Sequence, residues 1–210
     1  MSTENGFLYV AFSSLVAKGG AAKAVNHYFN KELARFQSAA RKANARGTTR
    51  RIRRLCRARD NKVRNIFHKI SRYIVNYCIA NNVGTIAVGY NPGWKQHCDM
   101  GKRANQSFVQ LPFRALVAQI EYKVALAGIT TIRVDERYTS RCSALDGEAL
   151  GQHARYAGRR VSRGLFRTSQ GILINADVNG AYNILRQAVP EARADGIQGA
   201  GRHPVVAAVL

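Results

Sequence analysis

Residues 109–134 read VQLPFRALVAQIEYKVALAGITTIRV, and this stretch decides the fold class that we expect. Apolar side chains recur at spacings of three and four along residues 109–127, which predicts a helix with one buried face that Gly128 closes. Residues 129–134 predict a strand, and residues 85–88 predict a short buried strand earlier in the chain. A strand, a crossover helix and a second strand predict a parallel pair with a right-handed connection. The expected fold class is therefore α/β.

Three acidic side chains fall where an open α/β sheet gathers its functional groups, beyond the carboxyl ends of the strands. Asp135 and Glu136 directly follow the strand at 129–134, and Asp177 opens a last helix after a short strand at 171–174. If these carboxylates face one another, a hard divalent cation with oxygen ligands best relieves their repulsion. Nucleases use such clusters to hold metals that activate water. The pattern therefore allows a metal-dependent nuclease site.

A plainer interpretation of the same acidic residues is also open. Asp177 lies at a strand-to-helix junction, where a carboxylate commonly caps a helix. Asp135 and Glu136 could form a surface turn, paired with Arg133 or Arg137. Composition does not decide between the two interpretations.

The chain is strongly basic, with 33 Lys and Arg against 12 Asp and Glu, a formal net charge of +21 and a pI near 10.7. A surplus of this size indicates a polyanion as partner, above all nucleic acid. The charge is concentrated in two predicted helices at residues 24–43 and 50–81. Residues 31–72 hold fifteen basic side chains and only two acidic ones, Glu32 and Asp60.

Six arginines between positions 50 and 59 would repel one another without a counter-anion, so we predict contacts with a phosphate backbone. The alternative is a solvated helix face, but such faces usually mix both signs of charge. Three more basic residues fall in the long loop predicted after residue 88. The predicted nucleic-acid-binding residues are Arg50, Arg51, Arg53, Arg54, Arg57, Arg59, Lys62, Arg64, Lys95, Lys102 and Arg103.

Composition also argues against several classes of protein. No apolar run approaches the roughly 18 residues of a membrane span, so we expect no membrane partner. Residues 1–6 do not resemble the start of a secretory signal, and we expect a cytoplasmic, nucleoid-associated protein. The histidines are scattered, and no two cysteines form a Cys-x-x-Cys pair, so zinc is not expected. The four cysteines are Cys56, Cys78, Cys98 and Cys142.

Several short motifs occur in an order that is more informative than any one of them. Together they resemble the OrfB/TnpB family of insertion-sequence proteins, which are RNA-guided nucleases related to type V CRISPR effectors. The resemblance runs from about Lys23 onward. Its motifs are NPGWKQ (91–96), GKR (101–103), NQSFVQLP (105–112), EYK (121–123), GI (128–129), ERYTS (136–140), NADVNGA (175–181), DGI (195–197) and HPV (203–205).

The resemblance implies a RuvC-like, RNase H-type domain in which three acidic residues coordinate Mg²⁺ for DNA cleavage and a guide RNA supplies recognition. The third acid corresponds to Asp177. The usual second acid follows the strand at 85–88, where this chain has Gly89 and Tyr90, so Glu136 is the candidate for a relocated glutamate. The strand that carries the first acid has no counterpart, and it would lie just upstream of Met1.

The resemblance also implies a division of the chain. The family's zinc ribbon is degenerate here, because only Cys142 matches one of its four thiolates, while Arg167 and Gln170 stand where the second pair would be. The expected parts are a RuvC-like core at 1–137 lacking its first strand and including a basic helical hairpin at about 24–82, a degenerate zinc-ribbon or target-binding insertion at 138–170, the end of the core at 171–189, and a tail at 190–210.

The function that we expect is that of an OrfB/TnpB-type transposase protein, ancestrally a Mg²⁺-dependent, RNA-guided DNA endonuclease. DNA is the expected partner, and the resemblance adds a guide RNA. We expect binding to persist and the chain alone not to cleave, because two carboxylates seldom replace three at a two-metal site. The alternative is a non-catalytic nucleic-acid-binding regulator or an inactive remnant. A ribosomal component would explain the charge but not the ordered motifs.

Overall fold

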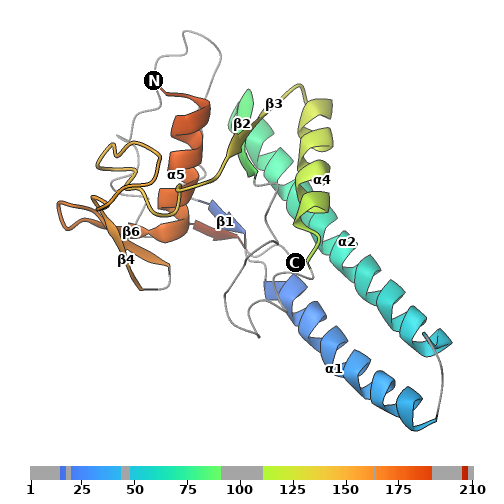
Figure 1. Cartoon of the computed structure of the whole chain (residues 1–210). Coiled ribbons are helices and arrows are strands. Elements are labelled where there is room, and N and C mark those ends of the chain that lie inside the picture. Colours follow the sequence, from blue (N-terminus) through green and yellow to red (C-terminus); the bar gives the residue numbers. More distant parts are fainter. Residues whose placement is uncertain are drawn as a thin grey trace. The chain divides into compact units, whose positions relative to one another are not determined.

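The computed structural model describes residues 15–17, 20–43, 48–90, 111–162, 164–190 and 205–207 (Figure 1). Helices and short strands are interspersed along the chain. In chain order the elements are β1 (Leu15–Ala17), α1 (Gly20–Lys42), α2 (Arg50–Ala80), β2 (Thr85–Tyr90), α4 (Phe113–Leu126), β3 (Thr130–Asp135), β4 (Arg159–Ser162), β5 (Leu165–Arg167), β6 (Leu173–Asn175), α5 (Ala176–Ala188) and β7 (Val205–Ala207).

The chain divides into two compact units, which we call the α/β unit and the helical unit. Helices α2 and α4 contribute to both, because the boundaries between the units fall within these helices. The α/β unit is drawn from Met1–Ala17, Val75–Pro92 and Glu121–Ala207, and the helical unit from Lys18–Ile74, Gly93–Ile120 and Ala208–Leu210.

The parallel strand pair β2–β3 lies at the centre of the α/β unit, with Thr85 opposite Thr130 and Tyr90 opposite Asp135. This is the pair that the sequence predicted, and the α/β class is confirmed. Strand β2 is longer than expected, because Gly89 and Tyr90 continue the hydrogen-bonded ladder instead of opening a loop. Helix α5 packs against both strands, so its first turn and the strand ends belong to one unit.

Gly128 ends the helix that precedes β3, as the sequence predicted. Its φ of +73° lies in the left-handed region, which glycine adopts without steric cost. The turn lets Ile129 N donate to Val124 O at 2.9 Å, and β3 begins at the next residue.

A three-stranded antiparallel sheet, β4–β5–β6, follows, and the sequence predicted only its last strand, at 171–174. Its interior is the buried cluster of Phe166, Ile174 and Ala176. Gly158 lies so close to this cluster that a β-carbon there would collide with the Phe166 ring. Strand β6 runs directly into α5, which places the N-terminus of that helix at the end of the sheet.

Helices α1 and α2 form the hairpin that the sequence predicted, and α2 agrees with the expected bounds to within one residue. Thr49 Oγ1 accepts a hydrogen bond from Ile52 N at 3.3 Å and so satisfies one of the free donors at the start of α2. The buried apolar positions of α2 in this unit recur at helical spacings and define one inner face. They are Ile52, Val63, Phe67 and Ile70.

Strands β1 and β7 form a parallel pair, with Leu15 opposite Val205. The many apolar side chains of residues 7–17 predict one or two short strands, and residues 7–14 lie outside the described residues. Among the helices of the described residues, none combines the length and the apolar character that crossing a bilayer requires.

Candidate nucleic-acid interface and acidic site residues

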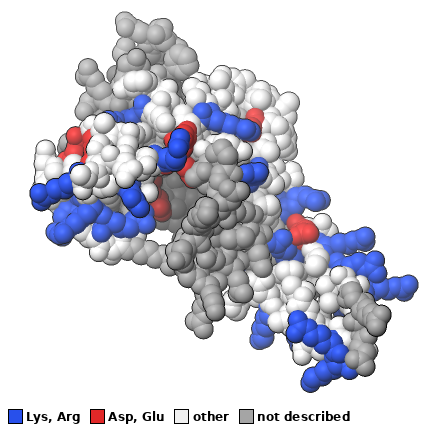
Figure 2. All heavy atoms as spheres, viewed as in Figure 1, with Lys and Arg blue, Asp and Glu red and all other residues white. Residues whose placement is uncertain are grey.

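Four exposed arginines on α2 line one hollow, and we call them the arginine tetrad: Arg50, Arg53, Arg54 and Arg57. Their spacings of three and four place them on one helix face, where all four are exposed. They line an open hollow of about 400 Å³. Figure 2 shows blue Lys and Arg side chains gathered over the α1–α2 hairpin on the face in view.

The arginine tetrad has no acidic partner within the described part of the chain, where the ion pairs involve other residues. Four guanidinium groups around one hollow raise the local positive potential, and a phosphate group is the anion that their planar donors fit best. The geometry therefore suits the backbone of a nucleic acid.

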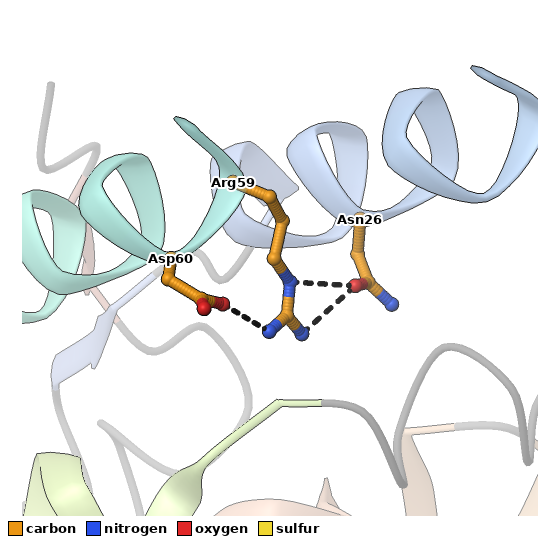
Figure 3. A network of polar contacts seen from close by, with 3 residues as sticks. All are labelled: Asn26, Arg59 and Asp60. Atoms are coloured by element: carbon orange, nitrogen blue, oxygen red, sulfur yellow. Dashed lines mark hydrogen bonds and ion pairs between the residues drawn. The ribbon is translucent and has the colours of Figure 1, made fainter. Parts of the chain in front are cut away.

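Arg59 differs from the tetrad because its guanidinium contacts other parts of the hairpin (Figure 3). Its Nε and Nη2 donate to Asn26 Oδ1 at 3.3 and 3.1 Å, and its Nη1 lies 2.7 Å from Asp60 Oδ1. The same group lies over the Phe29 ring, 5.5 Å from its centroid. Only 15% of the side chain is exposed, and Asn26 is 1% exposed. Arg59 thus joins α1 to α2.

A sequence signal for this role exists. Arg59 follows the buried Ile52 by seven residues and precedes the buried Val63 by four, so it belongs to the inner face of α2. Arg51 also turns toward α1, with its guanidinium 4.7 Å from the centroid of the Phe36 ring. Charge alone predicts nucleic-acid contacts for both arginines, and those contacts stay predictions.

The remaining basic candidates lie apart from the tetrad. Lys62 is exposed beside a hollow between α1 and α2, and Arg64 is exposed beside another that Asp60 and Gln119 also line. The structure thus brings four of the predicted residues together on one face and distributes the others around α2. Outside the described residues lie Lys95, Lys102 and Arg103.

Glu136 lies at the carboxyl end of β3, beside Gly89 of β2. A β-carbon on Gly89 would be 3.3 Å from both Cβ and Oε2 of Glu136, and 2.7 Å from Cδ1 of Ile184 on α5. The Glu136 carboxylate therefore reaches the point where a side chain at position 89 would start, and Ile184 leaves no room for that side chain.

Asp177 lies in the first turn of α5, but Asn175 is the residue that caps this helix. Asn175 Oδ1 accepts from Asp177 N at 2.8 Å and from Val178 N at 3.2 Å. The alternative in which Asp177 serves as the cap is therefore wrong. Its carboxylate is exposed at the positive end of the helix dipole, where a negative charge is favoured.

Asp135 forms the surface turn that the plainer interpretation predicted. Its carboxylate accepts from Arg137 N at 3.0 Å and from Arg137 Nε at 2.6 Å, and these bonds hold the pKa of Asp135 below its usual value. Arg133 instead forms a two-point pair with Glu121, at 2.5 and 2.6 Å. The hydrogen bond from Arg133 lowers the pKa of Glu121. The Asp135 carboxylate is thus held by its hydrogen bonds from Arg137.

The region expected to be a degenerate zinc ribbon is held together by carboxylates. Asp146 accepts from Ser169 N at 2.9 Å and from Ser169 Oγ at 2.6 Å, which joins two loops of this region. Glu148 accepts from Ser143 N at 2.6 Å and from Ala157 N at 2.8 Å. Within the ranges that the structure describes, no group of three His, Cys, Asp or Glu residues could hold a metal ion.

Two buried asparagines on α5 fix the backbone that follows β3, and the sequence analysis missed them. Asn183 Nδ2 donates to Thr139 O at 2.9 Å and to Cys142 O at 2.8 Å, and Asn179 Nδ2 donates to Cys142 O at 2.9 Å. Asn179 Oδ1 in turn accepts from Ala144 N at 2.9 Å. The sequence signal for this role is the pair of asparagines four residues apart on the inner face of a helix, because buried amides need hydrogen-bond partners.

Two family models match different parts of the chain. The OrfB_IS605 family, described as a probable transposase, matches residues 5–95, and the Cas12f1-like TNB domain matches residues 113–184. The chain belongs to the OrfB/TnpB family. This confirms the resemblance inferred from the ordered motifs.

Two curated relatives of this OrfB/TnpB chain carry related names. The CRISPR-associated endodeoxyribonuclease Cas12f1 of Sulfoacidibacillus thermotolerans is 31% identical over 158 residues, which are 72% of this chain and 34% of the relative. The TnpB-like protein ORF457 of Acidianus two-tailed virus is 26% identical over 184 residues, which are 83% of this chain and 37% of the relative. The chain thus spans little more than a third of the length of these relatives.

A solved structure shares the fold of this OrfB/TnpB chain. The cryo-EM structure of a Cas12f1–sgRNA–target DNA complex matches with a TM-score of 0.53 and 21% sequence identity. The match covers 75% of this chain and 41% of that one. At this identity the likeness establishes a common α/β arrangement.

Proposed function

We propose that this chain is a nucleic-acid-binding protein that uses the arginine tetrad to hold a phosphate backbone. The observation that carries the proposal is the hollow lined by Arg50, Arg53, Arg54 and Arg57, four exposed cations without an acidic partner among the described residues. Binding releases the counterions that would otherwise condense on the nucleic acid. Such contacts fix position and affinity but do not read sequence.

DNA and a guide RNA are the partners that we propose. The related Cas12f1 structure is named as a complex with an sgRNA and target DNA, and that name supports both polymers. The tetrad fits either one, because DNA and RNA present the same phosphate chemistry. Base pairing with a guide would supply the sequence recognition that arginines on a helix face do not.

We further propose that the α/β unit is a RuvC-like domain whose acidic site includes Glu136 and Asp177. Carboxylate oxygens are the donors that Mg²⁺ prefers, and neither residue is used as a helix cap. Glu136 fits the role of a relocated second acid, because its carboxylate lies at Gly89, where the family's usual acid would be. When bound, Mg²⁺ would supply activation of water and stabilisation of the leaving oxygen.

Binding without cleavage is the activity that we propose for the chain alone. Two acids from the described residues fall short of the three that the family uses, and the described residues offer no group of three. A non-catalytic regulator is the second candidate function, and this observation favours it. In both cases residues 138–170 form a zinc ribbon that has lost its metal ligands and that the carboxylates of Asp146 and Glu148 hold together.

The test measures affinity for labelled DNA against salt concentration. Replacing the tetrad by glutamine should flatten the dependence of log K on log salt by about 0.9 for each phosphate that the variant no longer neutralises. The matched control replaces the same residues by lysine, which keeps the charge and should keep most of the slope. An unchanged slope in the glutamine variant would place the binding surface elsewhere.

A nuclease assay tests the second part of the proposal. With Mg²⁺ or Mn²⁺, we expect no appreciable cleavage of single-stranded DNA by the chain alone. Robust cleavage that Asp177→Ala abolishes would overturn the non-catalytic assignment while confirming Asp177 as a site residue.

A further inference from the structure

A second hollow, of about 280 Å³, lies in the helical unit between α1 and α2. Its floor is apolar and is formed by Val25, Phe29, Leu55 and Ala58. Its volume lies just below the range for small-ligand sites, which begins at about 300 Å³. A single flat ring system suits this space better than a folded segment of protein does.

Tyr28 stands at this hollow with 58% of its surface exposed. The exposed Tyr28 ring leaves apolar surface in contact with water. A ligand that covers this ring removes the surface from water, which is favourable. The face of an aromatic ring is also the surface on which nucleobases stack, whatever their identity. Tyr28 therefore offers a stacking platform at the edge of an apolar hollow.

The charge around the hollow favours a polyanion as the occupant. Lys62 and Arg59 line it, and no acidic residue is among the described residues that line it. The Arg59 guanidinium is already paired with Asp60, so Lys62 is the cation that remains for a ligand. The bonds of Arg59 to Asn26 hold its guanidinium in place against the Phe29 ring, so this wall is rigid. An apolar floor under a cationic rim is complementary to a base that carries phosphates on either side.

The hollow and the arginine tetrad occupy neighbouring turns of α2, although no residue among those described lines both hollows. Ala58, which lines this hollow, follows Arg54 by four residues, and residues four apart are neighbours on a helix surface. A strand whose phosphates contact the tetrad can therefore continue towards this hollow.

We propose that this hollow receives an unpaired nucleobase of single-stranded nucleic acid, stacked on Tyr28 with the adjacent phosphate at Lys62. The inference rests on the proposed function, and it adds that the ligand is single-stranded at this point. A paired base lies inside its own stack and does not reach a side pocket without unpairing.

The test uses the full chain and fluorescein-labelled oligonucleotides of mixed sequence, with single-stranded DNA, single-stranded RNA and duplex DNA as separate arms. Anisotropy gives Kd at one fixed salt concentration. Tyr28→Ala should weaken single-strand binding at least about fivefold, since each stacked base contributes on this scale. Tyr28→Phe keeps the ring and should keep the affinity. Tyr122→Ala removes an exposed tyrosine from α4 and serves as the matched control.

A second readout reports stacking itself. An oligonucleotide that carries 2-aminopurine should lose fluorescence when saturated with the wild-type chain or with Tyr28→Phe, and should keep it with Tyr28→Ala. Circular dichroism confirms that each variant retains its helices. The DNA and RNA arms show which polymer supplies the base.

Each outcome has a defined meaning. Unchanged affinity and quenching in Tyr28→Ala, with the glutamine tetrad variant still losing its salt dependence, would overturn the base pocket and leave the proposed function in place. A wild-type chain that binds none of the oligonucleotides would overturn both. A change in oligomeric state on Tyr28→Ala without loss of binding would assign the hollow to a second copy of the chain and would also overturn the inference.

Discussion

The carboxylate of Glu136 occupies the space beside Gly89, with Oε2 lying 3.3 Å from the point where a β-carbon on Gly89 would be. The two residues lie on neighbouring parallel strands, at or just beyond their carboxyl ends. Glu136, which directly follows β3, therefore places its carboxylate beside Gly89 of β2, where no side chain is present.

Gly89→Ala should destabilise the α/β unit by about 0.5–1.5 kcal/mol, because the new methyl group would lie 2.7 Å from Ile184 Cδ1 and the end of that side chain would have to leave its rotamer. Chemical denaturation measures the change. The matched control is Gly180→Ala in α5, where the nearest atom would be 4.0 Å away and helix propensity favours alanine. Equal stability of the two variants would contradict the close packing at position 89.

Arg59→Ala should destabilise the helical hairpin by about 1.5–3 kcal/mol, since Asn26 Oδ1 loses two charged donors in a buried place. The ion pair with Asp60 adds little, because Asp60 is exposed. Arg57→Ala is the control, since it removes an exposed arginine from the same helix. Thermal unfolding followed by circular dichroism should separate the two variants, and equal melting temperatures would refute the joining role.

Asp146→Ala should lower the free energy of unfolding by about 1–3 kcal/mol, because Ser169 loses the acceptor that joins the two loops. Asp60→Ala provides a control at an exposed acid. Because the hydrogen bonds from Ser169 to Asp146 join the loops without a metal, adding a chelator should leave the melting temperature of the wild-type chain unchanged. A marked fall with chelator, restored by Zn²⁺, would show that a metal rather than Asp146 holds this region.

Acid should weaken the fold through carboxylates whose pKa is lowered. The hydrogen bond from Arg133 lowers the pKa of Glu121 below its ordinary value of 4.5. Burial raises the pKa of Asp146, but the nearby Ser143 side chain and the hydrogen bonds from Ser169 N and Oγ outweigh it, so that the pKa is lowered from 3.8. A lowered folded-state pKa gives stability that is complete above the unfolded value and is lost as the pH falls through the folded one.

Denaturation at pH values between about 6 and 3 measures this loss, with most of it expected below about 4.5. Glu121→Gln should be less stable than the wild-type chain near neutral pH and should lose less on acidification. A wild-type stability that stays level across this range would contradict the assignment.

The sequence predicted the elements whose signals are local. The periodicity of residues 50–81 indicated α2 almost to the residue, and Gly128 marked the end of α4 because only a left-handed turn fits there. Of the antiparallel sheet, only the short strand at 171–174 was predicted. Strands β4 and β5 were missed because strands of three or four residues are too short to show an alternating pattern.

The sequence predicted which types of residue form the candidate sites, but it did not predict how their side chains are arranged. Charge alone indicated nucleic acid, yet it could not separate Arg59, which faces α1, from the exposed tetrad, because that depends on which side of α2 is buried. Asn175 as the cap of α5 and the amide pair on that helix follow from hydrogen bonds that only the folded chain brings together, such as the bond from Asn179 to Cys142 O.

Helix α5 carries the Asp177 carboxylate in its first turn, and its Asn183 amide, two turns later, binds the carbonyls of Thr139 and Cys142. Helix α5 thus connects the exposed Asp177 carboxylate to the segment that leads into residues 138–170. Any displacement of that segment must either break buried amide bonds or carry the carboxylate with it. Substitutions around Thr139 can therefore shift the Asp177 carboxylate from a distance, with no change at Asp177 itself.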